Sequence, residues 1–360
     1  MVNQMTSLSA DLSADVYAPA SLQDLGLVPI ILQNEAGLRV EVLPYGATLR
    51  SIQLDGQELT LCHPQITDYL ENSGYLGSTV GRYANRIAGG LLQFGNEVLP
   101  LETAGGEHCL HGGKGFSQQR WQVQQQSSAE VLLFLYSADG DCGFPGDLSV
   151  WQKIRLQDTA VHIEFKATTT SRTVVSLTNH CYFNLDGSAD ICRHQLQIFS
   201  DAMLPVDASL IPTGQRQQVE GSAFDFREAK VIGQQLAMTD PQLLLTGGFD
   251  HCYLFPPQPL AVKDFTPHLA QNPPVLKPMA RLSAARSPLS LTVSSTLPGL
   301  QFYSGHGLGS PFTPNQGLCL EAQYWPDAPN RPDFPSTLLV AGDIWQQQIV
   351  YAFSKAHHFE

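Results

Sequence analysis

Residues 161–167 read Val-His-Ile-Glu-Phe-Lys-Ala, with an apolar side chain at every second position. This period of two is typical of a β-strand that packs one face against a core and turns the other toward water. The same alternation recurs at residues 38–42 and 289–293. Helical periodicity is scarce, and 30 glycines and 24 prolines supply frequent turns. The sequence therefore predicts an all-β fold of many antiparallel strands in two packed sheets.

The composition narrows the class of protein. The chain has 360 residues, 43% of them hydrophobic, which is enough for a large core. Its net charge of −13, without a basic run, argues against nucleic acid or anionic membrane as a partner. The seven cysteines lack a Cys-x-x-Cys pattern, which favours free thiols in a reducing compartment over disulfides or zinc. With no signal peptide or long apolar span evident, we expect a cytoplasmic protein.

The beginning of the chain differs from the rest. The first 20 residues are rich in Ser, Ala and Asp and lack a clear period. No shift in composition and no internal repeat divides the remainder. We therefore expect a loosely ordered leader over residues 1–25, followed by one domain over residues 26–360.

The most informative stretch for chemistry is residues 178–186, Thr-Asn-His-Cys-Tyr-Phe-Asn-Leu-Asp. It places His180 in a strand-like run, and an imidazole can give or take a proton near neutral pH. Four further stretches carry polar or charged groups beside glycines or aromatic residues. They are Gly81-Arg-Tyr-Ala-Asn-Arg-Ile87, Leu110-His-Gly-Gly113, Gly247-Gly-Phe-Asp-His251 and Leu320-Glu-Ala-Gln-Tyr-Trp-Pro-Asp327.

Glu321 lies at the end of an apolar run, where a carboxylate is costly unless it is paired or functional. Two interpretations fit this position: a structural ion pair with Arg331, or a general base whose pKa is tuned by partial burial. A glutamate and a histidine that face one small substrate would form an acid–base pair. Glu321 and His180 are therefore the leading candidates for such a pair.

His111 lies in Leu-His-Gly-Gly, whose glycines allow a tight turn or a close approach of the backbone to a ligand. His108 would complete a His-x-x-His pair, but a third metal ligand is not apparent, so we expect no metal. Arg86 offers five fixed donors that suit hydroxyls or carboxylates. Asp250, on a glycine-rich turn, either caps that turn or accepts hydrogen bonds from hydroxyls.

Together these groups suit a neutral polyol. Aromatic rings could pack against the C–H face of a sugar, and the candidates are Tyr83, Phe249 and Trp325. Neither a Gly-x-Gly-x-x-Gly fingerprint after a strand nor a phosphate loop that ends in Gly-Lys-Ser/Thr is found, so a nucleotide is not indicated.

In their order along the chain, these five stretches resemble the galactose mutarotase (aldose 1-epimerase) family. The resemblance extends from about Leu38 to about Tyr351. It implies a large, distorted two-sheet antiparallel β-sandwich, the galactose mutarotase-like supersandwich, with the sugar in an open cleft. It also implies interconversion of the α and β anomers of an aldohexose such as D-galactose or D-glucose, without a cofactor or a metal. Further matching motifs are Gly143-Phe-Pro-Gly146, Pro205-Val-Asp207, Ile211-Pro-Thr-Gly214, Phe224-Asp-Phe-Arg227, residues 298–303 and residues 325–332.

Residue by residue, the resemblance implies that Glu321 is the base, His180 the acid and His111 a second histidine near the ring oxygen and the C1 hydroxyl. Arg86 and Asp250 resemble residues that hold the sugar hydroxyls. Asn85 and Tyr182, which accompany Arg86 and His180 in their stretches, complete the expected substrate-binding set.

Two positions depart from the family pattern, because His108 and His306 stand where asparagine is frequent. They leave the sugar preference open.

Three alternatives remain at this point. A hexose-6-phosphate 1-epimerase would need several basic residues around the cleft, of which Arg86 is the one that the sequence identifies. A non-catalytic sugar-binding or regulatory protein would not need an acid–base pair. A glycosidase would need Asp250 and Glu321 about 5–10 Å apart. The sequence also leaves the preferred aldose and the oligomeric state undetermined.

Overall fold

The computed structural model of the protein describes residues 21–71, 74–258, 261–262 and 275–355. Residues 1–20 of the predicted leader lie outside the described residues. Residues 21–25 form a hydrogen-bonded turn, in which the main-chain N–H of Leu25 donates to the carbonyl of Ser21 at 3.0 Å. The division into a leader and a single domain stays a prediction.

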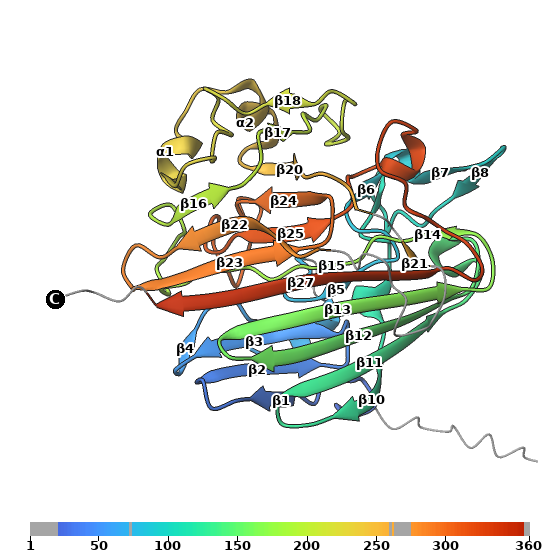
Figure 1. Cartoon of the computed structure of the whole chain (residues 1–360), viewed down its shortest axis with the longest axis horizontal. Helices are drawn as coiled ribbons and strands as arrows, with labels where there is room; N and C mark the ends of the chain where they lie inside the picture. Colours follow the sequence, from blue (N-terminus) through green and yellow to red (C-terminus); the bar gives the residue numbers. More distant parts are fainter. Residues whose placement is uncertain (1–20, 72–73, 259–260, 263–274, 356–360) are drawn as a thin grey trace, which may run out of the picture.

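The largest sheet has ten strands, and all of its neighbouring strands are antiparallel (Figure 1). Along β12 (Leu148–Gln157) and β13 (Ala160–Thr169) every second side chain is buried, so one face of the sheet covers the core and the other faces solvent. In spatial order the strands are β10 (Gln122–Gln126), β11 (Glu130–Ser137), β12 (Leu148–Gln157), β13 (Ala160–Thr169), β27 (Ile344–Lys355), β23 (Leu289–Ser295), β22 (Lys277–Ser283), β16 (Gln195–Ile198) and β19 (Lys230–Val231), with β21 (Ala261–Val262) beside β27.

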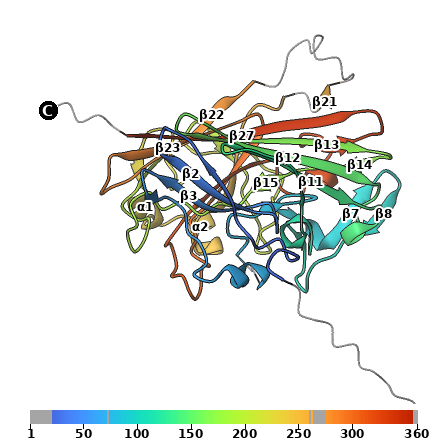
Figure 2. The ribbon, with the colours of Figure 1, turned by 90° about the horizontal axis from the view of Figure 1, so that it is seen from below.

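A second layer lies against the large sheet and is divided into smaller sheets. Seen from below, β12, β13 and β27 lie above β2 (Leu38–Leu43) and β3 (Thr48–Leu54) of this layer (Figure 2). One of its sheets has four strands, β1 (Ile30–Gln33), β2 (Leu38–Leu43), β3 (Thr48–Leu54) and β4 (Gln57–Glu58). Another has five strands, β18 (Gln217–Gln218), β17 (Ala202–Met203), β20 (Asp250–Leu254), β24 (Gly299–Tyr303) and β25 (Cys319–Gln323).

Four two-stranded sheets and two short helices complete the regular structure. The pairs are β5 (Thr79–Val80) with β15 (Thr178–Asn179), β6 (Arg86–Ile87) with β9 (Cys109–Leu110), β7 (Leu91–Phe94) with β8 (Glu97–Pro100), and β14 (Thr173–Val174) with β26 (Leu338–Leu339). The helices are α1 (Ile232–Leu236) and α2 (Pro241–Thr246). Short 3₁₀ turns occupy Ile66–Glu71, Ala88–Gly90, Phe116–Gln118, Asp141–Gly143 and Ala328–Asn330.

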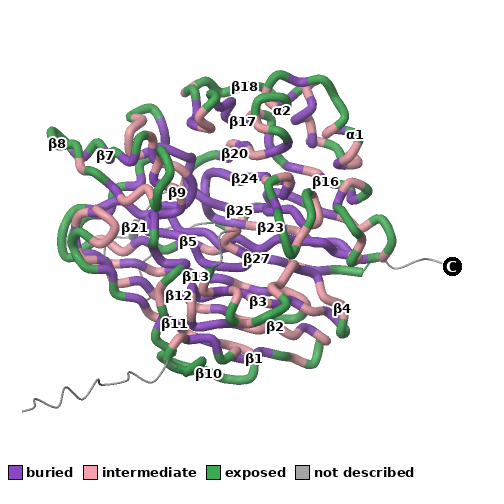
Figure 3. Tube along the Cα trace, turned by 180° about the vertical axis from the view of Figure 1, so that it is seen from behind, coloured by how far each residue is buried: buried purple, intermediate pink, exposed green. Residues whose placement is uncertain are grey.

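Both layers contribute to one large hydrophobic core. Val40 of the four-stranded sheet, Ile163 and Leu291 of the large sheet, and Phe302 of the five-stranded sheet all belong to it and are fully buried. Figure 3 shows buried stretches through the middle of the strands and exposed stretches in loops and at the edge strand β10. The all-β, two-layer prediction is confirmed, and the three quoted alternating stretches lie in β13, β2 and β23. Within the described residues, no helix is long and apolar enough to cross a membrane.

One main-chain segment ties the sheets of the second layer together. Phe183 forms isolated β-bridges to Thr60, beyond β4, and to Leu318, beside β25. This segment immediately follows His180. The same backbone that joins the four-stranded and five-stranded sheets therefore sets the position of that histidine.

A buried arginine anchors the segment before β6. Arg82 is 1% exposed, and burial lowers the pKa of its guanidinium to about 10. Its two terminal nitrogens donate to the carbonyls of Pro145 and Gly146 at 2.8 and 2.7 Å, and to the hydroxyl of Ser137 at 2.6 Å. The guanidinium thus replaces water as the donor for the loop between β11 and β12.

We expect Arg82→Met to lower the free energy of unfolding by about 2–5 kcal/mol, because it leaves these buried acceptors without a donor. Urea unfolding followed by tryptophan fluorescence measures the change. Arg155→Met is the matched control, because the Arg155 side chain is 34% exposed and pairs with Glu164. An exposed pair contributes about 0–1 kcal/mol, so equal losses in both variants would contradict the anchoring role of Arg82.

Candidate active site

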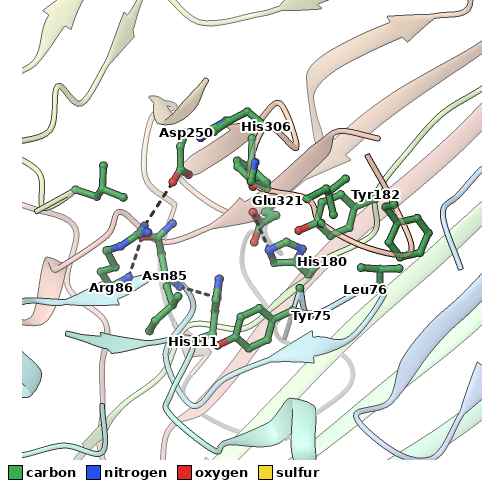
Figure 4. Close-up of a pocket in the computed structure, with 18 of the residues that line it drawn as sticks. Tyr75, Leu76, Asn85, Arg86, His111, His180, Tyr182, Asp250, His306 and Glu321 are labelled. Carbon is green, nitrogen blue, oxygen red and sulfur yellow. Dashed lines mark hydrogen bonds and ion pairs between the residues drawn. The ribbon is translucent and has the colours of Figure 1, made fainter. Parts of the chain in front are cut away.

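A cavity of about 510 Å³ opens beside the five-stranded sheet (Figure 4). Its lining includes all seven residues that the sequence predicts for the site: Asn85, Arg86, His111, His180, Tyr182, Asp250 and Glu321. The other lining residues are His63, Gly74, Tyr75, Leu76, Leu110, Leu210, Tyr303, His306, Gly307, Leu308, Gly309, Ser310 and Phe312.

The charged and titratable side chains come from the ends or middle of short strands. Glu321 is the central residue of β25, and Asp250 begins β20 in the same sheet. Arg86 begins β6, and His111 directly follows its partner strand β9. His180 directly follows β15. Five separate segments of the second layer therefore converge on one cavity.

The closest contact between the predicted acid and base joins His180 Nε2 to Glu321 Oε1 at 3.7 Å. The two side chains are 6% and 3% exposed. On the other side of the imidazole, Nδ1 lies 3.5 Å from the sulfur of Cys319. Cys319 and Glu321 are two residues apart on β25, so their side chains lie on the same face of the strand. One face of β25 therefore contacts both nitrogens of His180.

Burial determines the protonation of this pair. It raises the pKa of Glu321 well above its usual value, and the charge of Asp250 adds to that rise. Burial lowers the pKa of His180 to about 4. A low-dielectric site disfavours the charged form of each group. The ligand-free pair therefore favours a protonated carboxyl beside a neutral imidazole.

His111 is held by two reciprocal hydrogen bonds with Asn85. The main-chain N–H of Asn85 donates to His111 Nδ1 at 3.1 Å, and the main-chain N–H of His111 donates to the carbonyl of Asn85 at 3.0 Å. Burial lowers the pKa of His111 well below its usual value, and His180 and Arg86 lower it further. A neutral imidazole that accepts at Nδ1 carries its proton at Nε2. His111 is thus a hydrogen-bond donor at Nε2.

The turn that carries His111 needs its glycines. His111 has a positive φ of 52°, and Gly112 follows with a φ of 82°. A β-carbon on Gly112 would lie 2.2 Å from the carbonyl oxygen of Gly81. The prediction of a tight turn is confirmed, since the main-chain N–H of Gly113 donates to the carbonyl of Leu110 at 3.0 Å. A close approach of this backbone to a ligand stays a prediction. The turn locks the His111 segment onto the segment that leads to Arg86.

A second charged group faces the cavity from the side opposite His180 (Figure 4). Arg86 Nη1 lies 3.7 Å from Asp250 Oδ2, and Gln301 Nε2 donates to Asp250 Oδ1 at 2.7 Å. The side chains of Arg86 and Asp250 are 17% and 16% exposed. This arrangement leaves both able to exchange hydrogen bonds with a ligand, because neither is closed off by the protein.

The aromatic lining differs from the sequence prediction. Tyr75 packs its ring 4.6 Å from the ring of His111, and Tyr182 packs 5.1 Å from His180, measured between centroids. The prediction that the rings of Tyr83, Phe249 and Trp325 pack against a sugar is wrong. They are buried in hydrophobic cores, where the apolar neighbours of their strands place them.

The arrangement excludes one of the two interpretations of Glu321, the ion pair with Arg331, whereas the role of general base stays a prediction. Arg331 does not serve as its partner, because its guanidinium contacts Asp327 at 3.3 Å and the carbonyl of Pro212 at 2.6 Å. Glu321 Oε2 is buried without a hydrogen-bond partner from the described residues. An unsatisfied buried carboxyl oxygen is costly in a purely structural role.

A ligand atom from each of His111, His180 and Glu321 lies within 4.8 Å of the others, a spacing at which a metal ion could be considered. Metal binding would need a free lone pair on each imidazole. The Asn85 N–H already uses the lone pair of His111 Nδ1, which places the proton on Nε2. The geometry therefore favours hydrogen bonding to a ligand, and the absence of a metal stays a prediction.

The two residues that depart from the family pattern, His108 and His306, lie in different places relative to the cavity. His108 lies away from the cavity lining: its Nδ1 accepts from the N–H of Gly89 at 2.9 Å, and its Nε2 lies 3.1 Å from the carbonyl of Ser209. His306 lines the cavity, with Nδ1 3.2 Å from the hydroxyl of Ser304. Of the two, His306 is the one placed to contact a ligand.

Sequence reasoning missed three residues that shape the site: Tyr75, Gln301 and Cys319. The period of two along β25 could have identified Cys319, since it lies two residues before Glu321. Tyr75 and Gln301 carry no comparable local signal, because their roles depend on partners from distant parts of the chain.

Comparisons with known proteins agree with this fold. The family profile described as aldose 1-epimerase matches residues 29–352. Aldose 1-epimerase of Escherichia coli K12 is 38% identical over 341 residues, which cover 90% of this chain and 94% of that protein. Galactose mutarotase of Bos taurus is 35% identical over 335 residues, which cover 89% of this chain and 92% of that protein.

Solved structures show the same similarity. The crystal structure of galactose 1-epimerase from Lactobacillus acidophilus has a TM-score of 0.79 and 31% identity, and covers 91% of this chain and 95% of that one. That of the GalM/aldose epimerase homologue from C. elegans has a TM-score of 0.81 and 29% identity, and covers 92% and 99%. With a family profile and relatives that span nearly all of its length, this chain belongs to the aldose 1-epimerase family.

Proposed function

We propose that this protein is an aldose 1-epimerase, an isomerase that interconverts the α and β anomers of an aldohexose such as D-galactose or D-glucose. The observation that carries the proposal is the 3.7 Å contact between the buried Glu321 carboxyl and the His180 imidazole in a cavity of about 510 Å³. The names of the relatives from E. coli and Bos taurus support the reaction.

The reaction needs a base and an acid at the anomeric centre. The Glu321 carboxylate removes the proton of the C1 hydroxyl while the His180 imidazolium donates the proton on Nε2 to the ring oxygen. The bond between C1 and the ring oxygen breaks, and C1 becomes the carbonyl of the open aldehyde. Rotation about C1–C2 presents the other face of this carbonyl. Reclosure returns both protons along the same paths and yields the other anomer.

The pair performs this cycle with a single proton. Before ring opening the proton is on His180, and after opening it is on Glu321, so the total charge of the pair does not change. Burial disfavours the ion pair, whereas the 3.7 Å separation of opposite charges favours it. These two effects act on the same proton transfer in opposite directions, and a transfer that must run in both directions needs both proton positions to be accessible.

The other predicted residues would hold the sugar. His111 offers a donor at Nε2, set by its bond from Asn85, toward the oxygens of the anomeric centre. Arg86 donates to hydroxyls and Asp250 accepts from them, while Gln301 holds the carboxylate of Asp250 in place. Tyr182 supplies a ring beside His180. A neutral polyol matches this mixture of donors, acceptors and apolar surface.

The cavity is less suited to the alternatives. Among its described lining residues, Arg86 is the single lysine or arginine, which is a weak site for a phosphoryl group. A sugar sensor would have no use for a buried carboxyl with an unpartnered oxygen at the site.

We also propose a cytoplasmic location and no nucleic-acid partner, in agreement with the net charge of −13.

We expect the purified protein to accelerate the mutarotation of freshly dissolved α-D-galactose or α-D-glucose without changing the final rotation, because a catalyst leaves the equilibrium unchanged. Polarimetry measures the rate. A trace at the spontaneous rate for both sugars would contradict the proposal. Inhibition of galactose turnover by micromolar hexose 6-phosphate would instead favour the phosphorylated substrate.

We expect Glu321→Gln and His180→Asn each to lower kcat by about 10²–10⁴-fold, since each removes one proton-transfer group. The KM should change little, because the hydrogen bonds to the sugar remain. Polarimetry over a range of galactose concentrations separates the two constants. The matched controls are Glu130→Gln and His162→Asn, whose side chains lie in the large sheet away from the cavity, and near-normal kcat in either site variant would overturn the role assignment.

We expect kcat/KM to show an acid limb near pH 4. Because burial lowers the pKa of His180 to about 4, the pair takes up a second proton only below that pH and then lacks a carboxylate that can act as base. The alkaline limb reports loss of the shared proton, at a pH above the usual range of a glutamate because the pKa of Glu321 is raised. A single acid limb between pH 6 and 7, the ordinary range of histidine, would contradict this assignment.

A further inference from the structure

We propose that Cys319 is a positioning residue: its sulfur accepts a hydrogen bond from Nδ1–H of His180 and keeps Nε2 of that imidazole available for proton exchange with the sugar. The proposal rests on the proposed function, because it concerns the acid of that reaction.

The geometry places the two groups in contact. The sulfur of Cys319 lies 3.5 Å from His180 Nδ1, a normal separation for a hydrogen bond to sulfur. Both side chains are almost fully enclosed, with Cys319 0% and His180 5% exposed. Water is therefore poorly placed to replace the thiol as the partner of Nδ1. The hydrogen bond that the protein makes at Nδ1 then determines which ring nitrogen carries the proton.

The proton balance of the reaction selects one tautomer. The imidazolium carries protons on both nitrogens and gives the one on Nε2 to the ring oxygen. The neutral imidazole that remains has its proton on Nδ1 and a lone pair on Nε2, ready to take a proton from the C5 hydroxyl when the ring closes. Nδ1 thus donates in both states of the cycle, and the sulfur of Cys319, which lies 3.5 Å from it, accepts in both.

The strand register explains why one residue can meet this requirement. Cys319 and Glu321 are two residues apart on β25, so the same face of the strand contacts Nδ1 through sulfur and Nε2 through the carboxylate. The imidazole is held at both nitrogens by one rigid element. A shift of one residue in the register of β25 would remove both contacts together.

Sulfur also suits the acid strength that the reaction needs. A thiol is a weak acceptor, so it orients the imidazole while adding little stability to the imidazolium. Burial raises the pKa of Cys319 well above its usual value, which keeps the thiol neutral beside Glu321. The other titratable groups around His180 are Glu321, His111, Tyr75 and Tyr182, with Asp250 acting at longer range.

The experiment compares wild type, Cys319→Ser and Cys319→Ala by nitrogen NMR of histidine-labelled protein and by the pH dependence of mutarotation. The spectrum of His180→Asn assigns the resonances of His180. In wild type at neutral pH we expect a protonated Nδ1 and an unprotonated Nε2. Cys319→Ala should lose this tautomer preference and about tenfold in kcat, with little change in KM.

Cys319→Ser should retain the tautomer and most of kcat. Its oxygen is a stronger acceptor and should move the acid limb to higher pH, because it stabilises the imidazolium more. Cys181→Ala is the matched control, since its thiol is equally buried but contacts the carbonyl of Leu49. This control should leave the His180 tautomer and the acid limb unchanged.

Two results would overturn the proposal: a wild-type His180 with its proton on Nε2, or a Cys319→Ala variant with unchanged tautomer and acid limb. If Cys319→Ala does not fold, an unchanged acid limb in Cys319→Ser overturns it as well. Wild-type protein that fails to accelerate mutarotation would refute the proposed function, whereas the NMR tautomer of wild type would still decide the role of the Cys319 contact.

Discussion

The site depends on the burial of one carboxyl group beside one imidazole. In water Glu321 would be charged and would have little tendency to hold a proton at neutral pH. The core beneath β25 removes that preference, because it raises the pKa of Glu321 and lowers the pKa of His180. In water the pKa of histidine lies about two units above that of glutamate; burial reverses this order, so a proton shared by the ligand-free pair favours Glu321 over His180.

Burial of the Glu321 carboxyl and the His180 imidazole costs free energy. The division of the second layer into small sheets leaves room for the cavity that holds them. A continuous sheet would fill the space above the core with regular side-chain rows. Here Phe183 bridges Thr60 and Leu318, and the short pairs β5–β15 and β6–β9 bring loop residues over β25. Small sheets that end at one place leave room for a cavity, while the ten-stranded sheet supplies the hydrophobic area that stabilises the whole.

The two layers and seven of the residues that line the cavity could be predicted from the sequence, for identifiable reasons. Strands such as β13 have a period of two that is local and therefore readable. Glu321 stood out as a carboxylate in an apolar run, and His180 as a titratable imidazole in a strand-like run. Arg86 stood out through its five fixed donors. The aromatic lining could not be predicted from the sequence. Burial of Tyr83 and exposure of Tyr75 to the cavity both depend on where the small sheets end in the folded protein. Of the two partners of Arg331, Asp327 lies four residues away in sequence, whereas Pro212 is brought near by the fold.

The two histidines of the cavity show how main-chain geometry can assign different chemistry to identical side chains. His111 receives an N–H at Nδ1 from Asn85 and is thereby fixed as a donor at Nε2. His180 meets sulfur at Nδ1 instead, a partner that can accept a hydrogen bond. A histidine that must both give and take a proton at Nε2 needs an acceptor behind it, whereas one that only donates needs a donor. The difference therefore lies in one hydrogen bond per ring, supplied by β25 for one and by the turn before β6 for the other.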